Sequence, residues 1–181
     1  QNTKVDLGEL SDNNGNFRYV AIGSSLSAGV RDGGVYAAAQ QTSFPALLAQ
    51  QMGIKDFKQP LLEGNGTGKR TFAKDRYGNL KFAEIKGLDD KTPNAQLPKV
   101  EGEMDNLAVP YQKLMNASVN LKEPGAFREE HSKVSYAHSK RFETDSDGKS
   151  YLQIINEKLK KIDFFTFELG MDDCLEYYKN G

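Results

Sequence analysis

The chain has 181 residues, which is enough for one domain with a proper hydrophobic core. Hydrophobic residues make up 38% of it and charged residues 27%, and this composition excludes a wholly disordered protein. The formal net charge is −1 and the Lys and Arg residues are scattered, so no basic footprint indicates nucleic acid or an anionic membrane as a partner. No apolar run approaches the ~20 residues that a membrane-spanning helix needs.

The start of the chain favours export. Residues 1–16 are polar and are expected to form a tether in front of the domain. The chain begins with Gln rather than Met, as an exported protein does once its signal peptide is removed, and as a trimmed chain also would. The single cysteine, Cys174, cannot form an internal disulfide, so cysteine usage does not identify the compartment.

The first segments follow the pattern of an α/β domain. The apolar run 17–22 (FRYVAI) ends at Gly23, which indicates a buried strand. A stretch of small residues follows, and Thr42 or Ser43 can cap a helix over residues 44–52. A strand, a tight polar turn and a helix in this order present a functional group at the carboxyl end of the strand.

An exposed β-hairpin is expected in the middle of the chain. Residues 70–74 and 80–85 alternate with period two around the turn-forming segment 75–79. The hairpin belongs to an excursion from the main sheet at about 62–103. A second excursion at about 120–148 is expected to be a long loop or short helices on the surface.

The remaining elements extend the α/β pattern. They are a short second strand over 104–109, a helix opened by Pro110 and running to Ala117, an amphipathic helix over 151–161, a buried strand over 164–169 and a helix that begins at Met171. Asp172 and Asp173 favour the positive N-terminal dipole of that last helix.

Ser25 is the candidate nucleophile. It comes shortly after the first strand and precedes small residues, so its hydroxyl is expected to lie exposed at an edge of the sheet. A nucleophilic serine needs a base that takes its proton and N–H groups that stabilise an oxyanion. From this pattern alone, a serine-rich turn that satisfies its own backbone is the alternative.

The letters around this serine resemble a known family. Residues 19–29 (YVAIGSSLSAG) resemble the first block of the GDSL/SGNH hydrolases, in which Ser25 holds the nucleophile position. Tyr36 and the helix start at 43–48 also look like this family, and in particular like divergent exported lipoproteins of Bacteroidetes.

Two further blocks follow in the family's order. Residues 106–111 are similar to its second block and residues 167–173 to its third. The resemblance implies an α/β fold: a three-layer, flavodoxin-like SGNH sandwich with a parallel central sheet, incomplete here, plus the inserted hairpin. Residues 17–181 would form the N-terminal part of that domain. The implied activity is a serine ester hydrolase, esterase or lipase-like, in an exported lipoprotein at the cell surface or in the periplasm.

Three positions depart from the family pattern. Ser24 replaces the Asp beside the nucleophile. Tyr111 replaces a Gly whose N–H contributes to the oxyanion hole, and the Tyr N–H donates only if the local backbone does not require Gly. Asp172 replaces a donor Asn, and an ionised carboxylate only accepts hydrogen bonds and opposes a developing negative charge. A protonated Asp172 could donate, or Asp173 could take this position instead.

The family's general base is missing. Its last block, Asp-x-x-His, does not occur in the sequence. His131 and His138 lie in the polar 120–148 stretch and are expected to face solvent. The chain is therefore interpreted as a fragment of a longer protein, inactive by itself, whose C-terminal remainder would supply the base.

Two function classes remain open. In the first, Ser25 attacks a small-molecule or carbohydrate ester, Tyr111 donates its backbone N–H and Asp172 occupies the third-donor site. In the second, a catalytically degenerate SGNH-like module serves in surface binding or as a scaffold, which the changes at Tyr111 and Asp172 favour. An unrelated fold is the remaining reading.

No cofactor or metal is expected, and no oligomeric state is indicated. Residues 63–70 lack the spacing of a phosphate-binding loop. The acidic turn 145–148 lacks the bidentate Glu of a calcium loop, because Asn156 stands at the twelfth position.

Overall fold

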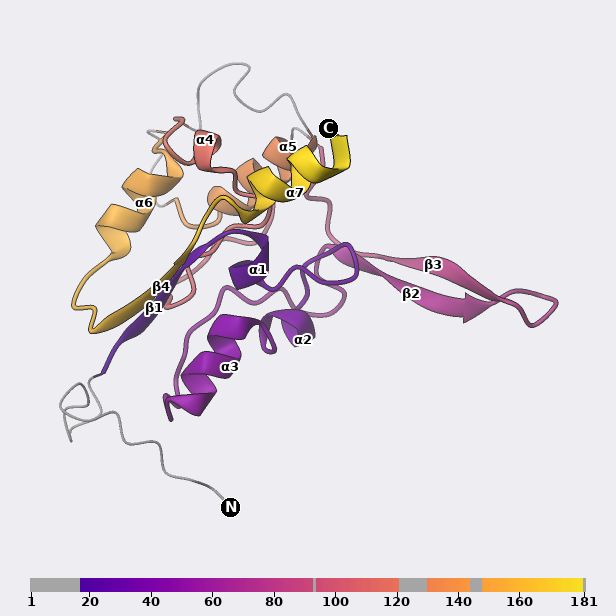
Figure 1. Cartoon of the computed structure of the whole chain (residues 1–181), viewed down its shortest axis with the longest axis horizontal. Coiled ribbons are helices and arrows are strands. Elements are labelled where there is room, and N and C mark those ends of the chain that lie inside the picture. Colours follow the sequence, from indigo (N-terminus) through magenta and orange to yellow (C-terminus); the bar gives the residue numbers. More distant parts are fainter. Residues whose placement is uncertain (1–16, 93, 121–129, 144–147, 181) are drawn as a thin grey trace.

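The computed structural model describes residues 17–92, 94–120, 130–143 and 148–180, so the 1–16 tether lies outside it. The described elements follow the order β1 Tyr19–Gly23, α1 Ser25–Ala28, α2 Ala37–Gln40, α3 Phe44–Gln51, β2 Gly68–Lys74, β3 Leu80–Lys86, α4 Leu114–Ala117, α5 Glu130–Ser139, α6 Tyr151–Lys158, β4 Phe164–Glu168 and α7 Met171–Asn180 (Figure 1). None of these helices combines the length and the apolar character needed to cross a membrane.

A small parallel sheet has β1 in its middle. On one side β1 pairs in parallel with β4, from Tyr19 opposite Phe164 to Gly23 opposite Glu168. On its other side the extended segment 105–109 runs parallel to β1 and exchanges backbone hydrogen bonds of 2.8–3.0 Å with it. The second strand expected over 104–109 therefore does join the sheet. Because the three segments are parallel, their carboxyl ends meet at one edge.

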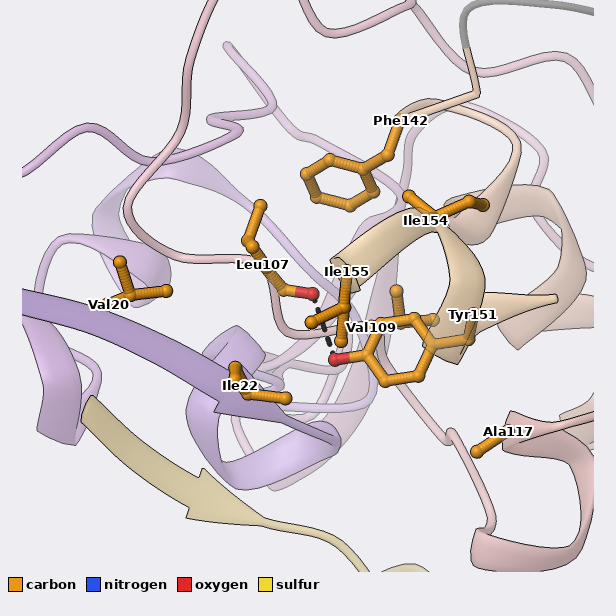
Figure 2. Close-up of a cluster of buried hydrophobic side chains, with 9 residues drawn as sticks. All are labelled: Val20, Ile22, Leu107, Val109, Ala117, Phe142, Tyr151, Ile154 and Ile155. Atoms are coloured by element: carbon orange, nitrogen blue, oxygen red, sulfur yellow. Dashed lines mark hydrogen bonds between the residues drawn. The ribbon is translucent and has the colours of Figure 1, made fainter. Parts of the chain in front are cut away.

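The two faces of β1 pack against different helices, as its period-two pattern requires. Val20 and Ile22 point to a core cluster that contains Leu107 and the α6 residues Ile154 and Ile155 (Figure 2). The opposite face carries Tyr19 and Ala21, which pack with α3. The chain thus has the expected mixture of α and β structure, with a small parallel sheet between helices and a separate antiparallel hairpin.

Tyr151 ties α6 to the carboxyl end of β1. Its fully buried hydroxyl accepts the Gly23 N–H at 3.2 Å and lies 3.1 Å from the Gly23 carbonyl and 3.0 Å from the Leu107 carbonyl, which share its proton (Figure 2). Burial raises the pKa of Tyr151 well above its ordinary value, so the hydroxyl stays protonated. The turn before Ser25 is fixed by this contact.

The expected hairpin is confirmed, with slightly longer strands. β2 and β3 pair in antiparallel register from Gly68 opposite Lys86 to Lys74 opposite Leu80, and they project from the body of the protein (Figure 1). At the base of the hairpin the chain approaches residues 33–36 so closely that a Cβ on Gly34 would lie 1.8 Å from the Gly68 carbonyl oxygen. Only a glycine fits at this contact.

Two expectations about single elements are wrong. The fourth helix begins at Leu114, because Tyr111 is left-handed (φ +57°) and Lys113 is extended, which rules out a helix from Pro110. The third strand is not buried: Phe165 and Phe167 are 58% and 55% exposed, since β4 pairs with β1 alone among the described residues.

The 120–148 excursion is not merely a surface feature. It contains α5, whose Val134 and Ala137 are buried, and Ala137 packs with Ala95 and Leu97. The period of this helix was hidden in the sequence by the polar residues on its buried face, His138 and Ser135 among them.

Candidate active site

Ser25 lies where the sequence analysis places it, at the carboxyl edge of the parallel sheet. β1 ends at Gly23, and Ser25 is the first residue of the short helix α1. The neighbours Ser24 and Ser27 are fully buried, whereas Ser25 is partly exposed. The chain leaves α1 through Gly29, whose left-handed backbone (φ 78°) reverses its direction.

The structure brings together all three candidate site residues. The Ser25 hydroxyl accepts the backbone N–H of Tyr111 at 2.9 Å and donates to Asp172 Oδ1 at 2.8 Å. The backbone N–H of Ser25 donates to Asp172 Oδ2 at 2.9 Å. Each residue comes shortly after one of the three parallel segments, so the sheet itself produces this arrangement.

Tyr111 donates from a backbone that favours glycine. Its φ of +57° lies in the left-handed region, which costs a residue with a Cβ roughly 1–2 kcal/mol. The condition set from the sequence, that the backbone should not require Gly, is therefore not met. The N–H nevertheless points at the Ser25 hydroxyl, and surrounding contacts hold the strained conformation in place.

Asp172, and not Asp173, faces the serine. Asp172 is 9% exposed, and both of its oxygens contact Ser25. Asp173 accepts the backbone N–H of Leu114 at 3.0 Å instead, and Glu176 one turn later forms an ion pair with Lys113. These contacts dock α7 against the segment that follows Tyr111 and so fix the position of Asp172.

The arrangement around Ser25 favours acceptance of hydrogen bonds over their donation. A carboxylate accepts hydrogen bonds and donates none, so Asp172 can hold the hydroxyl proton of Ser25 but cannot donate to an oxyanion. It also occupies the Ser25 N–H, one of the two backbone donors at this place. Stabilisation of an oxyanion here requires Asp172 to move away from that N–H.

Glu168 is a site residue that the sequence analysis missed. It ends β4 and accepts four hydrogen bonds of 2.6–3.3 Å from the backbone N–H and the hydroxyl of both Ser24 and Ser27. The signal was an acidic residue at the end of an apolar strand, in a chain whose other strand ends in a serine-rich turn. A carboxylate on the neighbouring strand thus faces Ser24.

His138, the histidine whose side chain is described, does not contact Ser25. His138 is 2% exposed, which contradicts the expectation that it faces solvent, because α5 turns this side chain inward. Its Nε2–H donates to Asp90 Oδ2 at 3.1 Å, and burial lowers the pKa of the imidazole despite the attraction of Asp90. The side chain of His131 lies outside the described residues. Asp172 is therefore the only titratable side chain, among those described, that forms a hydrogen bond with Ser25.

A polar cleft lies beside Tyr111. Its volume is about 520 Å³, and it extends between the base of the hairpin and the end of α7. Five cationic side chains contribute to its walls: Lys69, Arg70, Lys86, Lys91 and Lys179. Three acidic residues also contribute: Glu84, Asp89, which accepts the backbone N–H groups of Lys91 and Thr92, and Asp90, which is bound to His138. The cleft favours a polar or anionic ligand group.

Metal ligation finds no support in the described part of the chain, where His, Cys, Asp and Glu side chains form no cluster of three. Most of the acidic turn 145–148 lies outside the described residues. Comparison with known proteins finds no matching family model, no matching curated protein and no matching solved structure.

Proposed function

We propose that this chain carries the nucleophile of an SGNH-type serine ester hydrolase, with Ser25 as the attacking residue. One observation supports this above all: the Ser25 hydroxyl lies between the Tyr111 N–H and the Asp172 carboxylate at the carboxyl edge of a parallel sheet. Helices on both faces of β1 are in keeping with the proposed three-layer, flavodoxin-like arrangement.

In this proposal Ser25 attacks the acyl carbon of an ester. The backbone N–H groups of Ser25 and Tyr111 then donate to the oxyanion, after the Asp172 carboxylate has moved from the first of them. A base supplied by a further segment of the same protein removes the hydroxyl proton, because no described imidazole contacts the serine. The base returns this proton to the departing alcohol as the ester C–O bond breaks, and water then hydrolyses the acyl-serine. The polar cleft beside Tyr111 accommodates the rest of the substrate, a small-molecule or carbohydrate ester.

A fluorophosphonate probe tests this proposal without knowledge of the substrate, because it reacts with activated serines. We expect an adduct on Ser25, located by mass spectrometry of the digested chain, and its loss in the Ser25→Ala variant. Ser118→Ala is the matched control, since Ser118 is exposed but outside the site. Absence of an adduct on Ser25, in the longest form of the protein that can be produced, contradicts the proposal.

A second candidate is a catalytically inert binding module of the same fold. The observation in its favour is that both oxygens of Asp172 engage Ser25, one on the hydroxyl and one on the N–H. In such a module Ser25 and Asp172 join α7 to α1 as a structural contact. The probe experiment separates the two candidates, since an inert module leaves Ser25 unlabelled.

A further inference from the structure

The hairpin carries an apolar surface that no described residue covers. Phe72 and Phe82 stand directly opposite each other on β2 and β3, with ring centroids 4.7 Å apart, and are 65% and 71% exposed. Leu80 on the same face is 70% exposed, and Tyr77 in the connecting turn is 72% exposed. Four large apolar or aromatic side chains are therefore concentrated in the hairpin, which projects from the body of the protein (Figure 1).

This exposure is confined to one face of the hairpin. The other face carries no large apolar side chain at the equivalent positions, where Thr71 lies opposite Ala83 and Ala73 opposite Lys81. A two-stranded hairpin buries little apolar surface by itself, and a contiguous exposed patch of this kind usually marks an interaction surface. We therefore expect the face that carries Phe72, Leu80 and Phe82 to bind a partner.

The charge of the hairpin indicates what kind of partner binds this face. Residues 68–87 contain six Lys or Arg and only two acidic residues, a net charge of +4 in a chain whose total is −1. The near-neutral total therefore conceals a local concentration of positive charge. Asp75, one of the two acids, accepts the N–H groups of Tyr77 and Asn79 within the turn. The other acid, Glu84, lies at the base of the hairpin, opposite Arg70.

We propose that the hairpin docks on an anionic lipid bilayer, with Phe72, Leu80 and Phe82 entering the interfacial region and Tyr77 at headgroup level. The acyl boundary of a bilayer accepts Phe and Leu side chains, which bring no hydrogen-bonding group into it. Lys and Arg beside them reach anionic headgroups while their stems remain in the apolar layer. This docking is independent of any reaction at Ser25.

The chain contains no tryptophan, which makes a direct test possible. A Tyr77→Trp variant places a single fluorescent reporter in the turn, and Tyr178→Trp places the matched reporter on α7, where Tyr178 is 86% exposed. Vesicles of phosphatidylcholine with roughly one-third phosphatidylglycerol should shift the Tyr77→Trp emission to shorter wavelength and leave the control emission unchanged. High salt should weaken the effect, because it screens the lysines and arginines.

Two further variants separate the apolar from the electrostatic contribution. Phe72→Ser combined with Phe82→Ser, in the Tyr77→Trp background, should reduce partitioning about ten-fold or more, and Lys74→Gln combined with Lys81→Gln should reduce it on anionic vesicles. Circular dichroism checks that each variant is folded. The proposal is overturned if the Tyr77→Trp emission does not respond, if the Tyr178→Trp emission responds equally, or if heparin in solution shifts the emission and vesicles do not.

Discussion

The hydroxyl of Ser25 donates a hydrogen bond to Asp172, a residue 147 positions later in the chain, at an Oγ–Oδ1 distance of 2.8 Å. The same carboxylate takes the backbone N–H of Ser25, so the serine and the aspartate form a closed pair. The functional meaning of this pair is the central question about the site.

Exchange of Asp172 for Asn tests whether the carboxylate restrains the serine. The amide adds a donor and removes a negative charge beside the developing oxyanion, and one such donor is worth about 2.7–4 kcal/mol in a known case. We expect Asp172→Asn to accelerate fluorophosphonate labelling of Ser25 by about a hundred-fold. Asp173→Asn in the same turn should leave the rate unchanged. A slower rate in Asp172→Asn would show instead that this carboxylate takes the serine's proton.

The left-handed conformation of Tyr111 gives a second prediction. Tyr111→Gly retains the backbone N–H and removes the roughly 1–2 kcal/mol strain of a side chain at φ +57°, which offsets the lost packing of the ring. The midpoint of urea unfolding should therefore change little, and the labelling rate of Ser25 should be retained. Tyr111→Pro lacks the N–H and cannot adopt a positive φ, so it should lower both. Equal labelling in the two variants would rule out a role for this donor.

Glu168 should contribute to stability through the turn that carries Ser25. Its carboxylate satisfies four donors of Ser24 and Ser27, and a glutamine presents an N–H₂ group to some of them. We expect Glu168→Gln to lower the free energy of unfolding by about 1–3 kcal/mol. Glu157→Gln breaks only the exposed pair with Lys149 and should cost about 0–1 kcal/mol. Equal losses in urea unfolding would contradict this assignment.

The buried His138 predicts a loss of stability in mild acid. Burial lowers its pKa in the folded protein below the ordinary value of 6.5, so the folded imidazole stays neutral while the unfolded one takes a proton. Stability is therefore complete above pH 6.5 and falls as the pH drops from there toward the folded pKa. His138→Gln should lose this part of the pH dependence in urea unfolding between about pH 7 and 5. Identical pH profiles for the two proteins would refute it.

Local signals were sufficient for several elements. The apolar run that ends at Gly23 predicted β1, and the period-two alternation around the turn-forming segment 75–79 predicted the hairpin. Capping was predicted only in part: Ser43 is the N-cap of α3, but its buried hydroxyl makes no capping bond and has no partner among the described residues. The position of the N-cap follows from the local sequence pattern, whereas its capping hydrogen bond depends on the neighbours that the fold brings together.

The prediction of which residues are buried was the main error, because burial depends on what packs beside an element. The apolar run at 164–168 reads as an interior strand, yet β4 has a described neighbour on one side only. His138 was expected to face solvent, yet in the interior it donates a hydrogen bond to Asp90, 48 positions earlier. In the candidate site, the three family-like sequence segments predicted Ser25, Tyr111 and Asp172. Glu168 belongs to no such motif, so its role became visible only from the pairing of β1 with β4.

The separation of the site's partners along the chain affects its biosynthesis. A ribosome adds Tyr111 86 residues, and Asp172 147 residues, after Ser25. Until α7 has left the exit tunnel and docked, the nascent polypeptide holds a serine whose hydroxyl lacks its Asp172 acceptor. Probe reactivity at Ser25 in chains stalled at successive lengths would therefore time the docking of α7, and a protease cut before α7 would separate the serine from Asp172.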